Sequence, residues 1–248
     1  MYDGLITWDL TNGYRTIAPA LATNWSVSDD KTEYTFNLRE GVTFHDGSEF
    51  SAEDVVATFD RIVNPPDNIS IGGLGEQLAM VEEITALDDM TVVFKLSQPT
   101  PFFLEIMAGD AMVVYSKDTL EENDYDLRGV TVAPGTGPFK FVEFIPGEKI
   151  VLEANENYWN PELPYVDGIE MLHVGAWADR GTAVLTGQAD FSWNVSFDTW
   201  QEGANREEIG VAYAPCLNSH MVAINNTHPP LMTPACARRS IWPWTDRH

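Results

Sequence analysis

The sequence predicts an α/β protein built from short antiparallel strands and a few amphipathic helices. Three observations carry this prediction. Residues 34–38 alternate apolar and polar side chains, the period-two pattern of a strand with one buried face. Residues 51–63 place apolar side chains at helical spacing. Residues 81–96 and 140–154 each hold two alternating runs around a turn. We therefore expect a strand-turn-helix unit followed by two hairpins.

The strand-turn-helix unit over residues 32–64 is the most regular part of the chain. After the first strand, residues 42–44 resume the alternation, and His45-Asp46-Gly47 predicts a tight turn. Ser51 followed by Asp54 has the spacing of a capping box, in which the hydroxyl and the carboxylate satisfy backbone N–H groups of the first helical turn. We expect the helix to begin at Ser51 and to stop before the two prolines that follow the unit.

The rest of the chain is expected to alternate between short strands, short helices and loops. Stretches rich in glycine, proline and asparagine mark the boundaries between these elements. The further predicted elements are a strand within 2–10, a short element closing on Trp25, a glycine-punctuated loop over 68–75, a helix over 102–107, a strand reached through Gly109 and ending at Tyr115, a helix over 176–187, a strand ending at 192–194 and a strand over 218–226.

Length and charge exclude several classes of partner. The chain has 248 residues, enough for one large or two ordinary domains, and a formal net charge of −24. Nucleic acid and anionic lipid carry the same sign, so neither is an expected partner. We interpret the acidity as a means of keeping a secreted or salt-adapted protein in solution, rather than as a cation site. No stretch approaches the roughly 20 apolar residues of a membrane span.

The chain lacks the common signatures of a catalytic or metal site. The five histidines have no metal-ligand spacing, and there is no G-x-S-x-G motif. Ser219 and His220, as sequence neighbours, do not make a nucleophile and its base. Cys216 and Cys236 allow at most one disulfide, and whether they pair stays open. We predict no enzyme activity, no cofactor and no metal site, with a carboxylate-based hydrolase as the alternative from another class.

Several ordered motifs resemble one known family. They are Pro19-Ala20-Leu21-Ala22, Trp25, Asp30, Tyr34-Thr35-Phe36, Leu38-Arg39, Gly41-Val42, Phe44-His45-Asp46-Gly47, Ala52-Glu53-Asp54-Val55, Gly135-Thr136-Gly137-Pro138-Phe139, Asn157-Tyr158-Trp159 and Gly187-Gln188-Ala189-Asp190-Phe191. Together they resemble the dipeptide-, oligopeptide- and nickel-binding receptors of bacterial ABC importers, the extracytoplasmic solute-binding proteins of family 5. The resemblance covers the N-terminal half of such a receptor and fails after Pro230.

The resemblance implies a periplasmic-binding-protein-like fold of type II, a truncated two-lobed receptor whose third domain and C-terminal segment are missing. The beginning also looks truncated, because no secretory signal precedes the matching part. The loop over 133–139 is expected to be structural, with glycines that allow close backbone approach or positive φ. The implied segments are 1–33 as the first part of lobe I, 34–165 as an inserted small lobe, 166–215 as the return to lobe I, 216–233 as the start of the crossing to the missing domain, and 234–248 as an atypical tail.

The resemblance also implies a function. Such receptors capture a solute outside the cytoplasm, close on it by a hinge movement and deliver it to an ABC permease in the membrane. We expect peptides as the solute, with a nickel chelate, an opine or an oligosaccharide as alternatives, and a periplasmic location. We also expect weak or no binding by these residues alone, because the missing part supplies much of the cleft.

Four residues are candidate solute contacts. Asp110 lies on a turn near the expected mouth of the cleft, where it would pair with an amino group of the solute. Trp193 and Asn194 would supply an aromatic wall and an amide. Gly73 lies in a loop that lacks the Lys-Ser/Thr of a phosphate loop. For each, a purely structural role is the alternative: a solvated turn, core packing or a loop glycine.

The tail over 234–248 suggests a hypothesis about its origin. It carries three arginines and one aspartate, in a chain that is otherwise strongly acidic. Codons for Leu-Ala-Leu-Asp read one base later give Trp-Pro-Trp-Thr, which is the sequence of residues 242–245. We therefore expect the DNA beyond this point to hold a family-type continuation in a shifted frame. A nucleotide sequence with no such continuation would reject the hypothesis.

Overall fold

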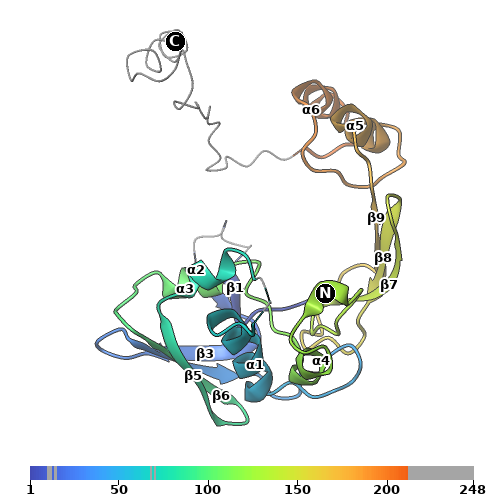
Figure 1. The fold of residues 1–248 in the computed structure, drawn as a ribbon. Coiled ribbons are helices and arrows are strands. Elements are labelled where there is room, and N and C mark those ends of the chain that lie inside the picture. Colours follow the sequence, from blue (N-terminus) through green and yellow to red (C-terminus); the bar gives the residue numbers. More distant parts are fainter. Residues whose placement is uncertain (10–12, 14–15, 68, 70, 212–248) are drawn as a thin grey trace, which may run out of the picture. The chain divides into compact units, whose positions relative to one another are not determined.

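The structure is a computed structural model that describes residues 1–9, 13, 16–67, 69 and 71–211 (Figure 1). The chain divides into two compact units, residues 1–174 and 175–248. The first unit combines strands and helices, and the described part of the second holds two helices. The predicted mixed α/β class is confirmed. The predicted strand over 218–226 and the tail lie outside the described residues, as do both cysteines.

The described strands pair antiparallel throughout, in sheets of two, four and three strands ordered β1-β2, β3-β4-β6-β5 and β7-β8-β9. The strands are β1 (Ile6–Trp8), β2 (Ile17–Pro19), β3 (Ala22–Val27), β4 (Glu33–Leu38), β5 (Val81–Asp88), β6 (Thr91–Leu96), β7 (Phe139–Ile145), β8 (Lys149–Ala154) and β9 (Gly168–Leu172). The helices are α1 (Ala52–Val63), α2 (Leu74–Gln77), α3 (Phe103–Met107), α4 (Lys117–Glu122), a 3₁₀ turn (Leu127–Gly129), α5 (Trp177–Leu185) and α6 (Phe197–Ala204).

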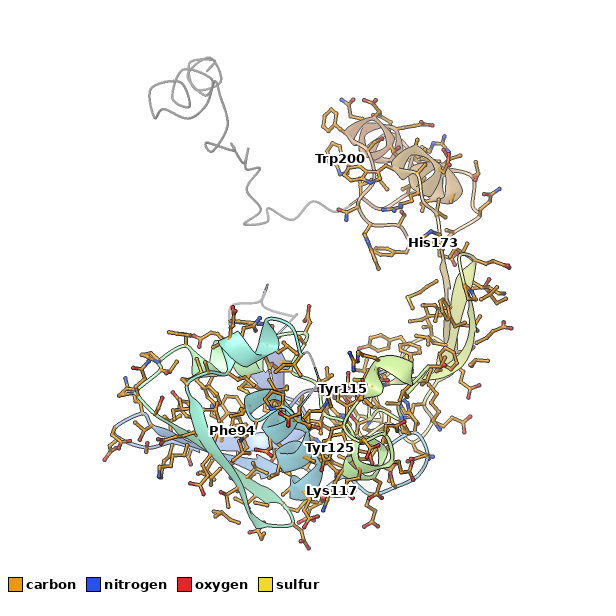
Figure 2. All side chains as sticks on the ribbon, viewed as in Figure 1. Phe94, Tyr115, Lys117, Tyr125, His173 and Trp200 are labelled. Atoms are coloured by element: carbon orange, nitrogen blue, oxygen red, sulfur yellow. The ribbon has the colours of Figure 1, made fainter. Side chains whose placement is uncertain are left out.

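The core of the first unit lies between the four-stranded sheet and α1, which packs against β5 and β6. Phe94 of β6 sits in this layer (Figure 2). Its ring centroid lies 5.3 Å from that of Phe59 on α1, 5.6 Å from Phe36 on β4 and 5.8 Å from Phe103 on α3. All four side chains are fully buried. One aromatic cluster therefore joins two strands and two helices.

Most elements predicted for this region are confirmed. They are the strand over 34–38, the helix from Ser51, the hairpin over 81–96 and the apolar helix after Thr100. The strand that was expected to end at Tyr115 is wrong, because only Val113 forms an isolated bridge, to Gly4. The reason is that Tyr115 bonds to α1: its N–H donates to the Thr58 hydroxyl (3.0 Å), which donates to the Tyr115 carbonyl (3.1 Å).

The run over 42–44 also forms no strand, and only Thr43 makes a bridge, to Glu49. The side chains of Val42 and Phe44 are nevertheless buried, so the alternating pattern here reflects side-chain burial rather than a hydrogen-bonded strand. The stretch closing on Trp25 is more regular than expected. It contains β2 and β3, and β3 is an edge strand of the four-stranded sheet.

The first four residues, which we call the N-terminal strap, run against the loop over 133–139. The Gly137 N–H donates to the Met1 carbonyl (2.9 Å), and the Tyr2 hydroxyl donates to the Ala133 carbonyl (2.8 Å). A Cβ on Gly137 would lie 2.5 Å from the Met1 carbonyl carbon, and one on Gly135 would collide with the Met1 carbonyl oxygen. Of the two explanations offered for these glycines, close backbone approach is confirmed, and neither has a positive φ.

Asp3 fastens the strap to the segment that follows β8. Its carboxylate accepts a hydrogen bond from the Trp159 indole N–H (2.9 Å) and a longer one from the Tyr158 hydroxyl (3.5 Å). The Arg39 guanidinium lies 4.1 Å from the centre of the Trp159 ring, a cation–π contact. Burial raises the pKa of Asp3, while the indole donor opposes that rise. The strap is therefore held by polar contacts from far along the chain.

His45 links the predicted turn to the same loop. Its Nε2 lies 2.9 Å from the Gly137 carbonyl, to which it donates, and its Nδ1 accepts from the Gly135 N–H (3.4 Å). These contacts require the neutral tautomer that carries its proton on Nε2. Burial lowers the pKa of His45, and the Met1 amino group and Lys140 lower it further, while the Gly137 hydrogen bond and Asp3 act in the opposite direction.

In the second unit, the predicted helix over 176–187 is confirmed as α5, and Gly187 follows it with a φ of 73°. Helix α6 was not predicted. It begins after Ser196, whose hydroxyl accepts from the Thr199 N–H (3.2 Å). Gly181 of α5 lies directly against Thr199 of α6, so a side chain there would collide. Arg206, which follows α6, donates to the Leu185 carbonyl at the end of α5 (2.8 Å) and so links the two helices.

The aromatic cluster gives a first prediction. Phe94→Ala should lower the free energy of unfolding by about 3–5 kcal/mol, because it removes a fully buried ring and leaves a cavity among three others. Urea denaturation followed by circular dichroism measures this change. Phe102→Ala is the matched control, since Phe102 is 56% exposed. Equal losses for the two variants would contradict the assigned core.

His45 gives a second prediction, on pH. The folded state favours neutral His45. The contribution of His45 to the free energy of unfolding is therefore present above the unfolded pKa of about 6.5 and is lost as pH falls below that value. His45→Gln keeps a side-chain N–H donor but does not titrate. We expect the free energy of unfolding to fall less steeply between pH 6.5 and 5 in this variant, by up to about 1.4 kcal/mol per pH unit.

The control for the pH experiment is His173→Gln, because the His173 side chain is exposed. This variant should keep the pH dependence of the unmodified chain. A His45→Gln variant with an unchanged slope would show that His45 is not held neutral by the fold.

Candidate ligand-binding region

Helix α1 carries a polar stripe as well as its apolar one. Asp54, Thr58 and Arg61 are spaced four and three residues apart, which places them on one face of the helix. Asp54 accepts from the Lys117 N–H at the start of α4 (2.7 Å), and Thr58 bonds to the backbone of Tyr115. The Arg61 Nε donates to the Tyr125 carbonyl (2.6 Å). This face of α1 therefore binds the segment from Tyr115 to Tyr125 through the backbone of Tyr115, Lys117 and Tyr125.

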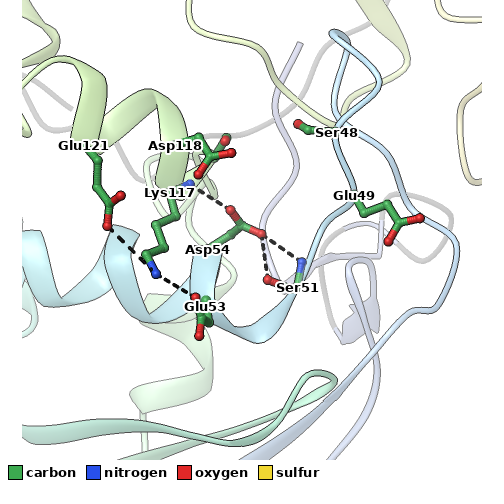
Figure 3. Close-up of a pocket in the computed structure, with 9 residues that line it drawn as sticks. Ser48, Glu49, Ser51, Glu53, Asp54, Lys117, Asp118 and Glu121 are labelled. Carbon is green, nitrogen blue, oxygen red and sulfur yellow. Dashed lines mark hydrogen bonds and ion pairs between the residues drawn. The ribbon is translucent and has the colours of Figure 1, made fainter.

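Asp54 is the carboxylate of this stripe and is buried, with 6% of the residue exposed. Besides Lys117, it accepts from the Ser51 N–H (2.8 Å) and from the Ser51 hydroxyl (3.1 Å), as Figure 3 shows. The predicted capping box is thus confirmed, and the Ser51 hydroxyl also donates to Asp54. Burial raises the pKa of Asp54, and these hydrogen bonds oppose the rise. One buried carboxylate caps the start of two helices.

An open polar depression lies beside this joint (Figure 3). Lys117 is its one basic side chain, and its Nζ lies 2.6 Å from Glu53 and 3.9 Å from Glu121. Hydrogen bonding to Lys117 lowers the pKa of Glu53, and the same contact raises the pKa of Lys117. The lining residues are Ser48, Glu49, Ser51, Glu53, Asp54, Ser116, Lys117, Asp118 and Glu121. The Asp54 carboxylate already accepts hydrogen bonds from Ser51 and from the Lys117 backbone, and the Lys117 side chain already pairs with Glu53. We therefore interpret the depression as the surface where α1 meets α4 rather than as a ligand site.

Neither a cluster of metal-binding side chains nor a membrane-spanning helix is found in the described ranges. Among these residues, no group of three or more His, Cys, Asp or Glu side chains is arranged to hold a metal ion. Nor is any described helix long and apolar enough to cross a membrane.

Two predicted solute contacts lie in the first unit. Asp110 is an exposed residue of the turn that follows α3, where the Met112 N–H donates to the Gly109 carbonyl (3.0 Å). Gly73 is also exposed and is the residue before α2. The predicted turn at Asp110 is therefore present, while the strand beyond it is not. Asp110 and Gly73 are not hydrogen-bonded to each other.

The other two predicted contacts, Trp193 and Asn194, lie in the second unit. They form a bend rather than the expected strand end, and Asn194 has a left-handed φ of 54°. A left-handed residue cannot continue a strand, and no described strand lies beside this segment to pair with it. Trp193 is 66% exposed and meets Phe191 edge-on, with ring centroids 6.2 Å apart. The alternative role of core packing does not fit this exposure.

The contacts of Thr58, Arg61 and Asp3 were not foreseen. Arg61 lies outside the apolar stripe of its helix, and it binds a backbone carbonyl of the segment before the 3₁₀ turn. The spacing of Asp54, Thr58 and Arg61 was visible in the sequence as a second stripe. Helix α6 also had a signal, because Ser196 precedes it in the position of an N-cap.

Comparison with known proteins places the chain in a family. Residues 16–238 match the family model of bacterial extracellular solute-binding proteins, family 5. This is a family of binding proteins rather than of enzymes. The chain is 29% identical over 233 residues to the glutathione-binding protein GsiB of Escherichia coli (strain K12). That alignment covers 94% of this chain and 44% of GsiB, so the chain spans less than half the length of this relative.

Solved structures give the same result for the fold. A dipeptide-binding protein from Pseudoalteromonas sp. SM9913 in complex with Met-Leu has a TM-score of 0.75 and 27% identity, over 84% of this chain and 44% of that one. The periplasmic binding protein DppA from Helicobacter pylori in complex with the peptide STSA has a TM-score of 0.67 and 35% identity, over 76% and 40%. The chain therefore belongs to the family 5 bacterial extracellular solute-binding proteins.

Proposed function

We propose that the chain is part of a receptor that captures peptides for import by an ABC transporter. The observation that carries this proposal is the chemistry of the similar proteins. Two of them hold peptides, Met-Leu and STSA, and the third is named for glutathione, which is itself a tripeptide. Peptides share a charged amino group, a carboxylate and backbone amides, so one set of backbone-reading contacts serves many sequences.

The candidate contacts suit that chemistry. The exposed carboxylate of Asp110 would pair with the amino group of a peptide. Trp193 exposes two thirds of its surface and would supply an apolar wall, while the neighbouring Asn194 amide would both donate to and accept from a peptide bond. Gly73 would allow the solute backbone to approach the chain closely.

The proposed mechanism is capture by closure. A solute that binds the closed state more tightly than the open one shifts the receptor towards closure by that difference in affinity. We propose the lobe assignment given by the resemblance, with residues 1–33 and 166–215 in lobe I and residues 34–165 as the small lobe. The closed receptor would act in the periplasm or at the cell envelope and dock on a membrane permease.

Other solutes remain the alternative within the same family. A nickel chelate, an opine or an oligosaccharide would need different partners from a peptide, such as metal-bound ligands or a surface rich in hydroxyl-binding groups. A catalytic carboxylate pair is not proposed, because the family consists of binding proteins.

The test is a binding comparison that tolerates weak affinity. Saturation-transfer NMR on the 248-residue chain is recorded with Met-Leu, Ser-Thr-Ser-Ala, glutathione, nickel-histidine, an opine and an oligosaccharide. We expect signals from the peptides only. We expect affinities roughly in the millimolar range, about −4 kcal/mol, because the chain covers 44% of its relatives' length. A preference for an alternative solute would overturn the proposal.

The aromatic contact gives a third prediction. Trp193→Ala should reduce the peptide signal several-fold, since it removes an exposed ring that is proposed to cover the solute. Trp177→Ala is the matched control, because Trp177 is 62% exposed in the same unit and has no proposed contact. The same loss in both variants would mean that the effect is not local to the solute.

Asp110 gives a fourth prediction, on charge. Asp110→Asn should weaken binding of Met-Leu by about tenfold, the value of one charge-assisted contact of about 1.4 kcal/mol. N-acetyl-Met-Leu, which lacks the amino group, should bind the two proteins equally. If Asp110→Asn weakens both ligands alike, Asp110 does not read the amino terminus.

A further inference from the structure

His45 joins the turn over 44–48 to the loop over 133–139 through three contacts. Its backbone N–H donates to the Gly135 carbonyl (2.8 Å). Both ring nitrogens are also used: Nε2 lies 2.9 Å from the Gly137 carbonyl, and Nδ1 accepts from the Gly135 N–H (3.4 Å). The ring therefore meets one acceptor and one donor of the same loop, 92 and 90 positions further along the chain.

This arrangement fits a single protonation state of the imidazole. The Gly137 carbonyl can only accept a hydrogen bond, and the Gly135 N–H can only donate one. A neutral ring with its proton on Nε2 satisfies both groups. Protonation adds an N–H at Nδ1, which then faces the Gly135 N–H, and two donors cannot bond to each other. A charged His45 therefore loses one contact with the loop and removes the acceptor of the Gly135 N–H.

The charged groups that face His45 do not offset this loss. The Met1 amino group of the strap and Lys140 of β7 disfavour a charged ring, whereas Asp3 favours it. Both oxygens of the Asp3 carboxylate already accept hydrogen bonds, from an indole N–H (2.9 Å) and a phenol hydroxyl (3.5 Å). Asp46, in the turn itself, is exposed and accepts hydrogen bonds within that turn. Burial, the largest influence, lowers the pKa of His45.

The other contacts of the loop decide how far its release would spread. The Gly137 N–H donates to the strap (2.9 Å). The Asn155 side-chain amide shares the Gly137 carbonyl with His45 (3.1 Å), and the Asn155 N–H donates to the Pro138 carbonyl (2.8 Å). These two bonds join the start of β7 to the segment after β8. The aromatic cluster around Phe94 contains no residue of this loop, so the loop can move without opening that cluster.

We propose that His45 is a pH-sensitive latch between the turn over 44–48 and the loop over 133–139. Neutral His45 fastens the loop to the turn. Protonated His45 releases Gly135, so the loop and the start of β7 loosen while the four-stranded sheet and α1 stay folded. Because the loop leads directly into β7, the latch sets how firmly the β7–β8 hairpin is attached to the rest of the first unit. The latch does not depend on which solute the chain binds.

Amide hydrogen exchange, read residue by residue by NMR on the 248-residue chain, tests the latch. From pH 7 to pH 5 the protection of the Gly135 N–H should fall about tenfold, after correction for the intrinsic exchange rate. The reason is that opening lets His45 titrate with its ordinary pKa of about 6.5, and protonation then stabilises the open loop. An unchanged protection of Gly135 would overturn the proposal.

Low concentrations of urea distinguish a local opening from unfolding of the whole unit. A local opening exposes little surface, so exchange at Gly135 should hardly respond to urea. The amides of β4 and β6 should be better protected, and their exchange should speed up with urea. If Gly135 has the same protection and the same urea response as these strands, the loop opens only when the whole unit unfolds, and no latch exists.

His45→Gln separates the latch from other titrating groups. A glutamine side chain offers both a donor and an acceptor but does not titrate. Exchange at Gly135 should therefore lose its pH dependence in this variant. His173→Gln, at an exposed histidine, should keep it. Circular dichroism at pH 7 shows whether each variant is folded. A tenfold loss of protection that persists in His45→Gln would assign the effect to another group and reject the latch.

The ring nitrogen shifts of ¹⁵N-labelled histidine test the geometry without any substitution. At pH 7.5 we expect a neutral His45 with its proton on Nε2. A charged ring, or a neutral ring with its proton on Nδ1, would contradict the proposal. Peptide binding by a chain that shows no latch would leave the proposed function standing.

Discussion

The structure of the first unit depends on how one helix, α1, is held on two sides. Its apolar stripe packs on the four-stranded sheet, and its polar stripe of Asp54, Thr58 and Arg61 binds the backbone from Tyr115 to Tyr125. Asp54 matters most among these, because it is a buried charge. Its desolvation is costly unless hydrogen bonds replace water, and three donors do so. Helix α4 therefore starts where Asp54 can accept from its first N–H.

A second set of polar contacts joins the two ends of the first unit in sequence. The N-terminal strap bonds to residues 133, 137 and 159, more than 130 positions away. The contact requires glycines in the loop over 133–139, because a side chain there would collide with Met1. His45 binds the same loop in its neutral form. The β7–β8 hairpin is thus fixed to the core through backbone contacts, which suits the structural role expected of this loop.

The exposed apolar surface falls in two places that bear on function. One is the face and edge of β7-β8-β9 in the first unit, and the other is the group of aromatic side chains in the second unit that includes Trp193. A receptor that closes on its solute needs surfaces that are open in one state and covered in the other. The exposed aromatic side chains of the second unit support the proposed solute capture, to which Asp110 and Gly73 of the first unit would also contribute.

The sequence by itself determined the local elements and the family. Alternation predicted β4 and the two hairpins, Ser51 and Asp54 predicted the start of α1, and the ordered motifs carried the resemblance that the comparisons confirmed. Local signals suffice there because caps, turns and periodicity act over a few residues. The same signals misled at Tyr115 and at Trp193, where apolar runs were expected to form strands.

Only the tertiary structure decided the rest. A strand needs a neighbour to accept its hydrogen bonds, and the sequence does not say whether one is present, so Tyr115 bonds to α1 instead. Arg61 and Asp3 find partners 64 and 156 residues away, separations that no local pattern encodes. Exposure of the candidate contacts, too, was fixed by packing. Composition and spacing identified what kind of protein this is, while the pairing of distant backbone groups decided which of its surfaces remain open.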